Sequence, residues 1–231
     1  MRFKTLIMIP LLVFALASCG AQPQSTQSTE GTQSTEGADA MALMPEWQYG
    51  APSELAALPP YGDLLTKDQT QLFEAAWRMY DGFGGCSTGY IHDCDTTVEV
   101  PQEDYDWDLV YDLDTGFDTY DDFITAMHAV FTDDYCDELL ACGGDAPGLI
   151  ERDGKLWSLE ADRGSNIEYM SVAYALVSRS DTEIVFNMTG HYAPLDDNGD
   201  WIEAQEYTQD YPIKMEKTSD GWRFASFAIP Y

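Results

Sequence analysis

Apolar residues recur at helical spacing in the first half of the chain. From Thr66 to about Tyr80 they lie on one stripe, and glycines beginning at Gly82 follow, so we predict a helix that ends there. The stripe consists of Leu72, Phe73, Ala76, Trp77 and Tyr80.

Two further helices are predicted before residue 147. The first begins at Thr119, a suitable N-cap residue, and buries one apolar face. That face consists of Phe123, Met127 and Val130. A shorter helix is predicted from Thr132 towards Leu140.

Between the first and second predicted helices, apolar residues recur at every second position. Aromatic and apolar residues at 105, 107, 109 and 111 alternate with Asp106, Asp108 and Asp112. This alternation predicts a strand with one aromatic face and one acidic face.

Residues 148–231 read as short strands separated by turn residues. The segment "LIERDGKLWSL" predicts a hairpin through Asp153 and Gly154, and Asn198-Gly199 and "SDGWRF" mark two later turns. One strand face consists of Met170, Val172, Tyr174 and Leu176, and its partner's face of Ile184, Phe186, Met188 and Tyr192. Helices to about 147 followed by an antiparallel sheet over 148–231 predict an α+β domain, 44–231, whose sheet packs over its helices.

The N-terminus has the pattern of an export signal. Arg2 and Lys4 precede a short apolar core that is closed by small residues, and Cys19 follows directly. The sequence "LASC" resembles the bacterial lipobox, so we predict a signal peptide over 1–18 and lipidation of Cys19. An ordinary signal peptide with a chance cysteine is the alternative. Residues 19–43 are polar and repetitive, and we predict a disordered tether there.

The chain is strongly acidic, with 11 Lys and Arg against 41 Asp and Glu. Removing residues 1–18 takes away two cations and leaves 9 − 41 = −32. Nucleic acid and anionic lipid headgroups would be repelled. The 73 residues between Arg78 and Arg152 contain 19 acids and no Lys or Arg. This segment is either a solubilising face or a surface that attracts a basic partner or a divalent cation.

Four cysteines remain after Cys19: Cys86, Cys94, Cys136 and Cys142. An even number in an exported chain predicts two disulfides, and three connectivities are possible. We favour the two short loops, 86 with 94 and 136 with 142, because glycines accompany each. A zinc site is the competing interpretation, and its usual close ligand pairs are missing.

No catalytic motif is recognisable, and none of the three histidines has an evident nucleophile beside it. We therefore predict no catalytic residue, no cofactor and no metal site. Two binding alternatives stay open. The aspartates in "DLDTGFDTYDD" have the oxygen ligands that calcium takes, and the many Trp and Tyr side chains suit a sugar or peptidoglycan ligand, although core packing is their ordinary role.

Three segments carry a family resemblance: "FEAAWRMYDGF", "FITAMHAVFTDDYCDELL" and "GLIERDGKLWSLEADRG" with the strands that follow. From Thr66 to Tyr231 the chain resembles the IseA-type inhibitors of cell-wall DL-endopeptidases. Its later part is similar to the cystatin-like cone of nuclear transport factor 2 relatives, a fold that hosts binders and enzymes. The resemblance implies a noncatalytic protein that occupies the cleft of an NlpC-type cysteine peptidase.

Together these patterns predict a monomeric, lipid-anchored protein on the outer face of a bacterial membrane that docks on a basic cell-wall peptidase. The predicted docking residues are Asp104, Asp106, Trp107, Asp108, Asp112 and Asp114. The alternatives are a surface lipoprotein that binds peptidoglycan, a sugar or calcium, and a small-molecule enzyme with its site in the cone.

Overall fold

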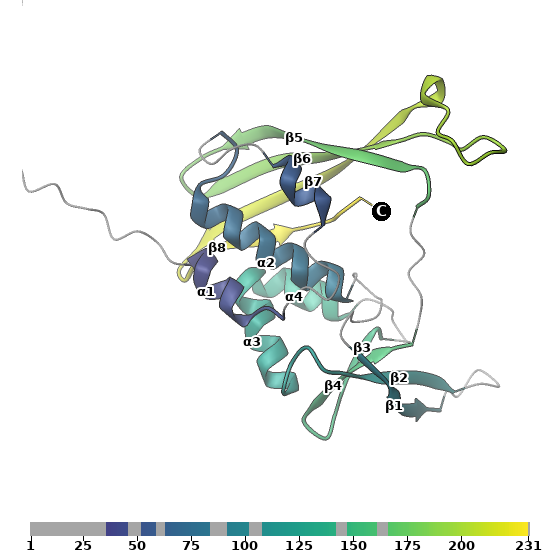
Figure 1. Cartoon of the computed structure of the whole chain (residues 1–231). Coiled ribbons are helices and arrows are strands. Elements are labelled where there is room, and N and C mark those ends of the chain that lie inside the picture. Colours follow the sequence, from purple (N-terminus) through teal and green to yellow (C-terminus); the bar gives the residue numbers. More distant parts are fainter. Residues whose placement is uncertain are drawn as a thin grey trace, which may run out of the picture. The chain divides into compact units, whose positions relative to one another are not determined.

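The structure is a computed structural model of the whole chain, and it describes residues 36–45, 52–58, 63–83, 92–101, 108–141, 147–160 and 166–230. All of them belong to one compact unit, Ser34–Tyr231. Within these ranges the fold is α+β, as predicted, with four α-helices and two antiparallel sheets (Figure 1).

The helices are α1 (Glu36–Leu43), α2 (Lys67–Phe83), α3 (Tyr120–Val130) and α4 (Asp133–Leu140), with short 3-10 helices η1 (Ser53–Ala57) and η2 (Glu203–Gln205). The strands are β1 (His92–Val100), β2 (Leu109–Asp114), β3 (Leu149–Arg152), β4 (Lys155–Leu159), β5 (Tyr169–Arg179), β6 (Glu183–Tyr192), β7 (Tyr207–Thr218) and β8 (Gly221–Ser226).

The three predicted helices form where the local sequence places them. At the start of α2, Thr66 Oγ1 accepts a hydrogen bond from the Gln69 N–H at 3.2 Å, and Gln69 Oε1 accepts one from the Thr66 N–H at 3.1 Å. This reciprocal pair is a capping box. Thr119 caps α3 by accepting from the Asp122 N–H at 3.1 Å. Both helix starts are therefore set by residues three positions apart.

The predicted disordered tether is wrong over residues 36–43, because these residues form α1 and pack into the domain. Ala40 is buried in the core. The Glu36 carboxylate accepts from the Trp222 N–H at 2.9 Å, and the Gly37 N–H donates to Asp68 Oδ1 at 2.9 Å. The predicted signal peptide, and the predicted tether up to residue 35, lie outside the described residues.

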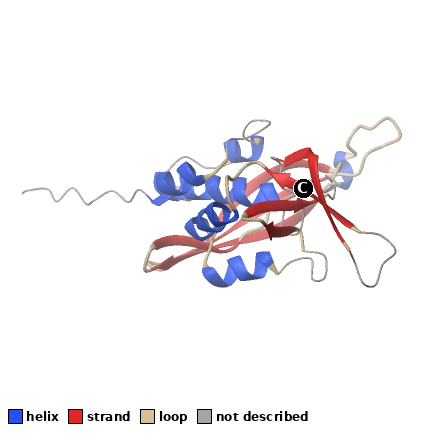
Figure 2. Cartoon of the chain, turned by 90° about the horizontal axis from the view of Figure 1, so that it is seen from below, coloured by secondary structure: helices blue, strands red, loops and turns tan. Residues whose placement is uncertain are grey.

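The predicted single sheet is two sheets. The first has the order β1-β2-β4-β3 and the second β5-β6-β7-β8. The β3–β4 hairpin forms as predicted, with positive φ at Asp153 and Gly154, but β4 pairs with β2 and not with the later strands. Its turn contacts the start of α3, where the Tyr120 N–H donates to the Gly154 carbonyl at 3.1 Å. Figure 2 shows the strands and helices from a second direction.

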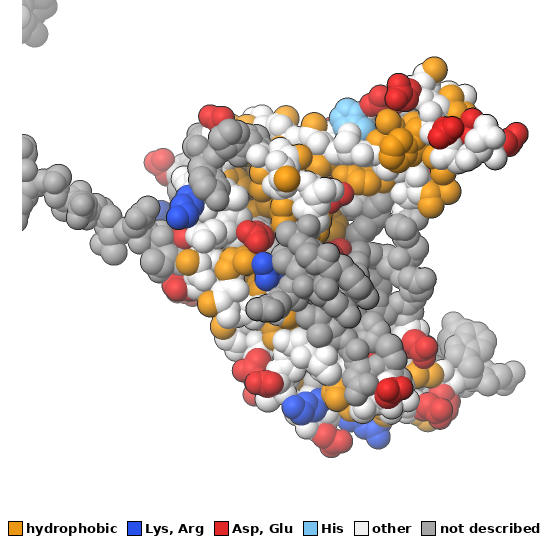
Figure 3. All heavy atoms as spheres, viewed as in Figure 1, with side chains coloured by type: hydrophobic (Ala, Val, Ile, Leu, Met, Phe, Trp, Pro, Cys, Tyr) orange, Lys and Arg blue, Asp and Glu red, His pale blue; other side chains and the backbone are white. Residues whose placement is uncertain are grey.

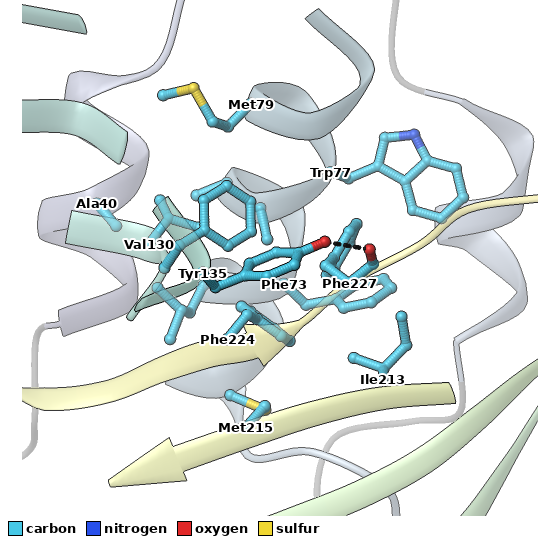
Figure 4. Packing of buried hydrophobic residues seen from close by; sticks show 14 of the residues in the cluster. Ala40, Phe73, Trp77, Met79, Val130, Tyr135, Ile213, Met215, Phe224 and Phe227 are labelled. Atoms are coloured by element: carbon cyan, nitrogen blue, oxygen red, sulfur yellow. Dashed lines mark hydrogen bonds between the residues drawn. The ribbon is translucent and has the colours of Figure 1, made fainter. Parts of the chain in front are cut away.

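The core lies between the helices and the inner face of β6, β7 and β8, and its centre is Phe73 on α2. The Phe73 ring centroid is 5.8 Å from that of Phe186 on β6, 6.0 Å from Phe224 on β8 and 5.4 Å from Phe227. Tyr135 of α4 joins this cluster and donates its hydroxyl to the Phe227 carbonyl at 2.5 Å (Figure 4). Each fully buried Phe contributes about 1.5–3 kcal/mol through burial. No helix in the described part of the chain is long and apolar enough to cross a membrane.

Candidate functional site: a tyrosine cluster on the second sheet

The predicted acidic docking surface is only partly described, and the described part is mostly buried. Asp104, Asp106 and Trp107 lie outside the described residues, and Asp108 is exposed just before β2. Asp112 and Asp114 on β2 are only 5% and 7% exposed.

Asp112 and Asp114, which the sequence predicted to dock on a partner, are therefore buried in the described fold. Asp112 is in register with Ser158 of β4, and Asp114 accepts hydrogen bonds from Ser158 Oγ at 3.3 Å and from the Gly116 N–H at 2.8 Å. The alternation along the chain shows that β2 has two faces, but Tyr111 and Asp112 are both buried, so the packing covers both faces at this point. On the face drawn in Figure 3, acidic side chains are spread over several elements and do not gather in one patch.

The predicted disulfides are not shown. Cys19, Cys86 and Cys142 lie outside the described residues, and Cys94 falls in β1. Cys136 on α4 is buried and forms no disulfide with another described residue, and burial, with a smaller contribution from Asp133, raises the pKa of its thiol to about 12. Lipidation at 19 and both pairings stay predictions.

Two of the three histidines, His128 and His191, each lie beside a carboxylate. His128 Nδ1 lies 2.8 Å from Asp133 Oδ1, and His191 Nδ1 lies 2.6 Å from Glu206 Oε1. Neither ring is hydrogen-bonded to a serine or a cysteine of the described residues. Within the described residues no three His, Cys, Asp or Glu side chains are placed to hold a metal ion.

A group of tyrosines gathers at one end of the second sheet. On β6, Ile184, Phe186 and Met188 face the core, and the same face continues to Gly190 and Tyr192. Tyrosines of the two neighbouring strands lie on the same face, because the strand register pairs Tyr192 with Tyr169 of β5 and with Tyr207 of β7. We define the tyrosine cluster as Tyr169, Tyr174, Tyr192, Tyr207 and Tyr211.

Within the tyrosine cluster, Tyr192 contacts Tyr169, Tyr207 and Tyr211 directly. Tyr192 stacks on Tyr207 with a centroid distance of 5.3 Å and an interplanar angle of 16°, and it meets Tyr169 edge-on at 5.7 Å. The hydroxyls of Tyr192 and Tyr211 share a hydrogen bond of 2.6 Å. Gly190 permits this packing, because a Cβ there would lie 2.7 Å from the Tyr192 ring.

Two carboxylates border the cluster. The Tyr207 hydroxyl donates to Glu168 Oε2 at 2.7 Å. Tyr169 is hydrogen-bonded to the Glu54 side chain, and the Tyr174 hydroxyl donates to the Glu54 carbonyl at 3.2 Å. The cluster therefore has an acidic edge formed by Glu168, just before β5, and by Glu54 in η1.

The surroundings of four tyrosines of the cluster favour the neutral phenol over the phenolate. Burial raises the pKa values of Tyr169, Tyr174 and Tyr192, and the hydrogen bond to Glu168 is the main cause that raises the pKa of Tyr207. Near neutral pH these hydroxyls are hydrogen-bonding groups and not nucleophiles or bases. The arrangement suits binding.

The outer part of the site is apolar and open to solvent. Ile167 is 70% exposed, Trp201 47% and Tyr207 44%. They are neighbours in space, because Trp201 Nε1 donates to the Ile167 carbonyl at 3.5 Å and Tyr207 bonds to the next residue, Glu168. We call Ile167, Trp201 and Tyr207 the aromatic rim. Figure 3 shows hydrophobic side chains exposed along this sheet, with acidic side chains beside them at its right-hand end.

The sequence interpretation missed this site because it assigned most Trp and Tyr side chains to the core. One signal was available in the sequence. The apolar alternation along β6 is interrupted by Gly190 and then resumes with Tyr192, which is typical of a position where a ring lies over the backbone.

No known protein-family model matches this chain, and no curated protein sequence matches it either.

Proposed function

We propose that this protein is a noncatalytic, lipid-anchored binding protein outside the bacterial membrane, and that it holds a basic partner protein against the aromatic rim. The observation that carries the proposal is the solvent-exposed rim over a packed tyrosine cluster with two bordering carboxylates. Trp and Tyr side chains contribute most often to the binding energy of protein interfaces.

Charge supports a basic partner. The whole chain has a formal charge of −30, so a cationic surface would be attracted from a distance and the association would weaken as salt is added. At close range, Glu54 and Glu168 replace the buried Asp112 and Asp114 as the acidic groups that a partner can reach.

The placement of α1 also supports the proposal. The chain enters the described fold at Glu36, which is bonded to Trp222 beside the β7–β8 turn. The tyrosine cluster lies at the opposite end of β7, and a strand of 12 residues is about 40 Å long at the usual rise per residue. Within the folded unit, the start of α1 and the tyrosine cluster therefore lie at opposite ends of β7.

The partner we propose is an NlpC-type cell-wall peptidase with a basic cleft, as the family resemblance implies. The test is turnover of a muropeptide substrate by such peptidases with the full chain added in detergent. We expect inhibition that is relieved by salt, and an inhibitory concentration that rises about tenfold or more with Trp201→Ala, the effect of losing a strong interface residue.

Val177→Ala is the matched control, because Val177 is 59% exposed at the other end of β5. It should leave the inhibition unchanged. Unchanged turnover with excess protein, or equal inhibition by Trp201→Ala, would contradict the proposal.

A saccharide ligand is the second candidate, favoured by the exposed rings of Trp201 and Tyr207. Pull-down on insoluble peptidoglycan separates the two candidates. Binding that survives high salt and is lost in Trp201→Ala would favour a sugar ligand, because stacking on a ring is not screened by ions as charge attraction is.

A further inference from the structure

Glu168 combines an unpaired charge with an exposed aromatic neighbour. Its Oε2 atom accepts the Tyr207 hydroxyl at 2.7 Å, and it forms no ion pair with any Lys or Arg of the described residues. The same is true of Glu54, which borders Tyr169 on the other side of the cluster. Neither of the two carboxylates that border the tyrosine cluster is therefore neutralised by a Lys or Arg of the described residues.

From this combination we infer that the aromatic rim with Glu168 is a receptor for a single ammonium group, the side chain of a lysine on the partner protein. The inference rests on the proposed function and names the partner group that the site recognises. A cation is attracted to the face of a Trp or Tyr ring within about 6 Å of its centroid, and a carboxylate beside the ring adds a direct charge–charge interaction.

The ring faces available for this contact follow from the packing. One face of Tyr207 is covered by Tyr192, which stacks at 5.3 Å, so a ligand would approach the opposite face. Trp201 is held near Glu168 by the bond from its Nε1 to the Ile167 carbonyl. The Tyr207 ring is held by this stack and by its bond to Glu168, and such pre-ordering lowers the entropy cost of binding.

We expect lysine to be preferred over arginine. A guanidinium group binds a carboxylate best through two parallel hydrogen bonds, one to each oxygen. Because Tyr207 already donates to Oε2 of Glu168, Oε1 is the less occupied acceptor. An ammonium group acts as a compact point charge and needs only one oxygen together with a ring face.

The experiment is an NMR titration of the full chain in detergent with N-acetyl-lysine amide. We expect chemical-shift changes at the Trp201 indole N–H and the backbone amides of Ile167 and Glu168. N-acetyl-arginine amide should bind more weakly. Binding of the arginine compound with equal or higher affinity, or shifts spread evenly over the sheet, would overturn the inference.

Two substitutions and a matched control sharpen the test. Glu168→Gln should weaken lysine binding about three- to tenfold, and Trp201→Ala by a similar factor, which corresponds to the energy of one partly desolvated cation–π contact. Glu160→Gln removes the same charge from an exposed site just after β4 and should leave the affinity unchanged. Equal losses in Glu168→Gln and Glu160→Gln would show only the effect of net charge and would overturn the inference.

The inference and the proposed function can fail separately. Site-specific lysine binding without peptidase inhibition would support the ammonium receptor and contradict the proposed peptidase partner. Peptidase inhibition that is unchanged by Glu168→Gln, with no shift at Trp201 on adding the lysine compound, would support the proposed function and overturn the receptor.

Discussion

Gly190 and Tyr192 show how one missing side chain positions a binding surface. With hydrogen in place of Cβ at 190, the Tyr192 ring lies over the β6 backbone and presents itself to Tyr169 and Tyr207 on either side. The exposed Tyr207 ring then rests on a buried one. Its position is set by packing and by its bond to Glu168.

Gly190→Ala tests this arrangement. A methyl group there would lie 2.7 Å from the Tyr192 ring, so the ring must move, and we expect the free energy of unfolding to fall by about 1–3 kcal/mol. Urea unfolding followed by far-UV circular dichroism measures the loss. In a Tyr192→Leu background the same substitution should cost much less, and an equal cost in both backgrounds would show that the ring is not the cause.

At the scale of elements, α1 is held by contacts to distant parts of the chain and not by its own composition. It has eight residues, and isolated helices of that length are marginal in water. The bonds from Trp222 to Glu36 and from Gly37 to Asp68 tie it to the β7–β8 turn and to α2.

Glu36→Ala should release α1 from the domain. The Trp222 N–H loses its acceptor, which we expect to cost about 1–3 kcal/mol, and amide hydrogens of residues 36–43 should exchange faster. Hydrogen exchange read by mass spectrometry measures this. Glu36→Gln keeps a side-chain carbonyl as acceptor and should change exchange less. If the two variants exchange alike, the hydrogen bond is not what holds α1.

At the scale of the whole molecule, the dominant property is the surplus of negative charge. With 41 acids and 11 Lys and Arg, the folded chain repels itself, and compaction brings those charges together. The described Lys and Arg side chains offset part of this locally, as Lys214 does between Glu183 and Glu216.

Monovalent salt should therefore stabilise the fold. Raising NaCl from about 0.01 M to about 0.15 M shortens the screening length from about 30 Å to about 8 Å. If screening contributes about 1 kcal/mol, the melting temperature rises by about 2–4 °C for a domain of this size. Calorimetry measures the shift, and KCl should act as NaCl does. A melting temperature that falls, or that responds to only one of the two cations, would contradict self-repulsion as the cause.

The local sequence was sufficient to predict a feature wherever the residues that interact to form it are close together in the chain. Thr66 and Gln69 are three residues apart, so the start of α2 could be predicted, and the same holds for Thr119 with Asp122. The Asp153-Gly154 turn and the apolar face of β6 are likewise short-range patterns. These features determined the α+β class without knowledge of the packing.

The candidate site could not be predicted in this way, because its members meet only after the strands pair. Tyr169, Tyr192 and Tyr207 become neighbours when β5 and β7 flank β6 in one register. Asp112 and Asp114 became buried, and the β3–β4 hairpin joined β2, through pairings that no periodicity specifies. The sequence by itself determined the helices, the turns, the charge and the alternating strand faces, because these depend on residues a few positions apart. The tertiary structure decided which faces are covered and which side chains gather, because burial and strand order depend on contacts between distant segments.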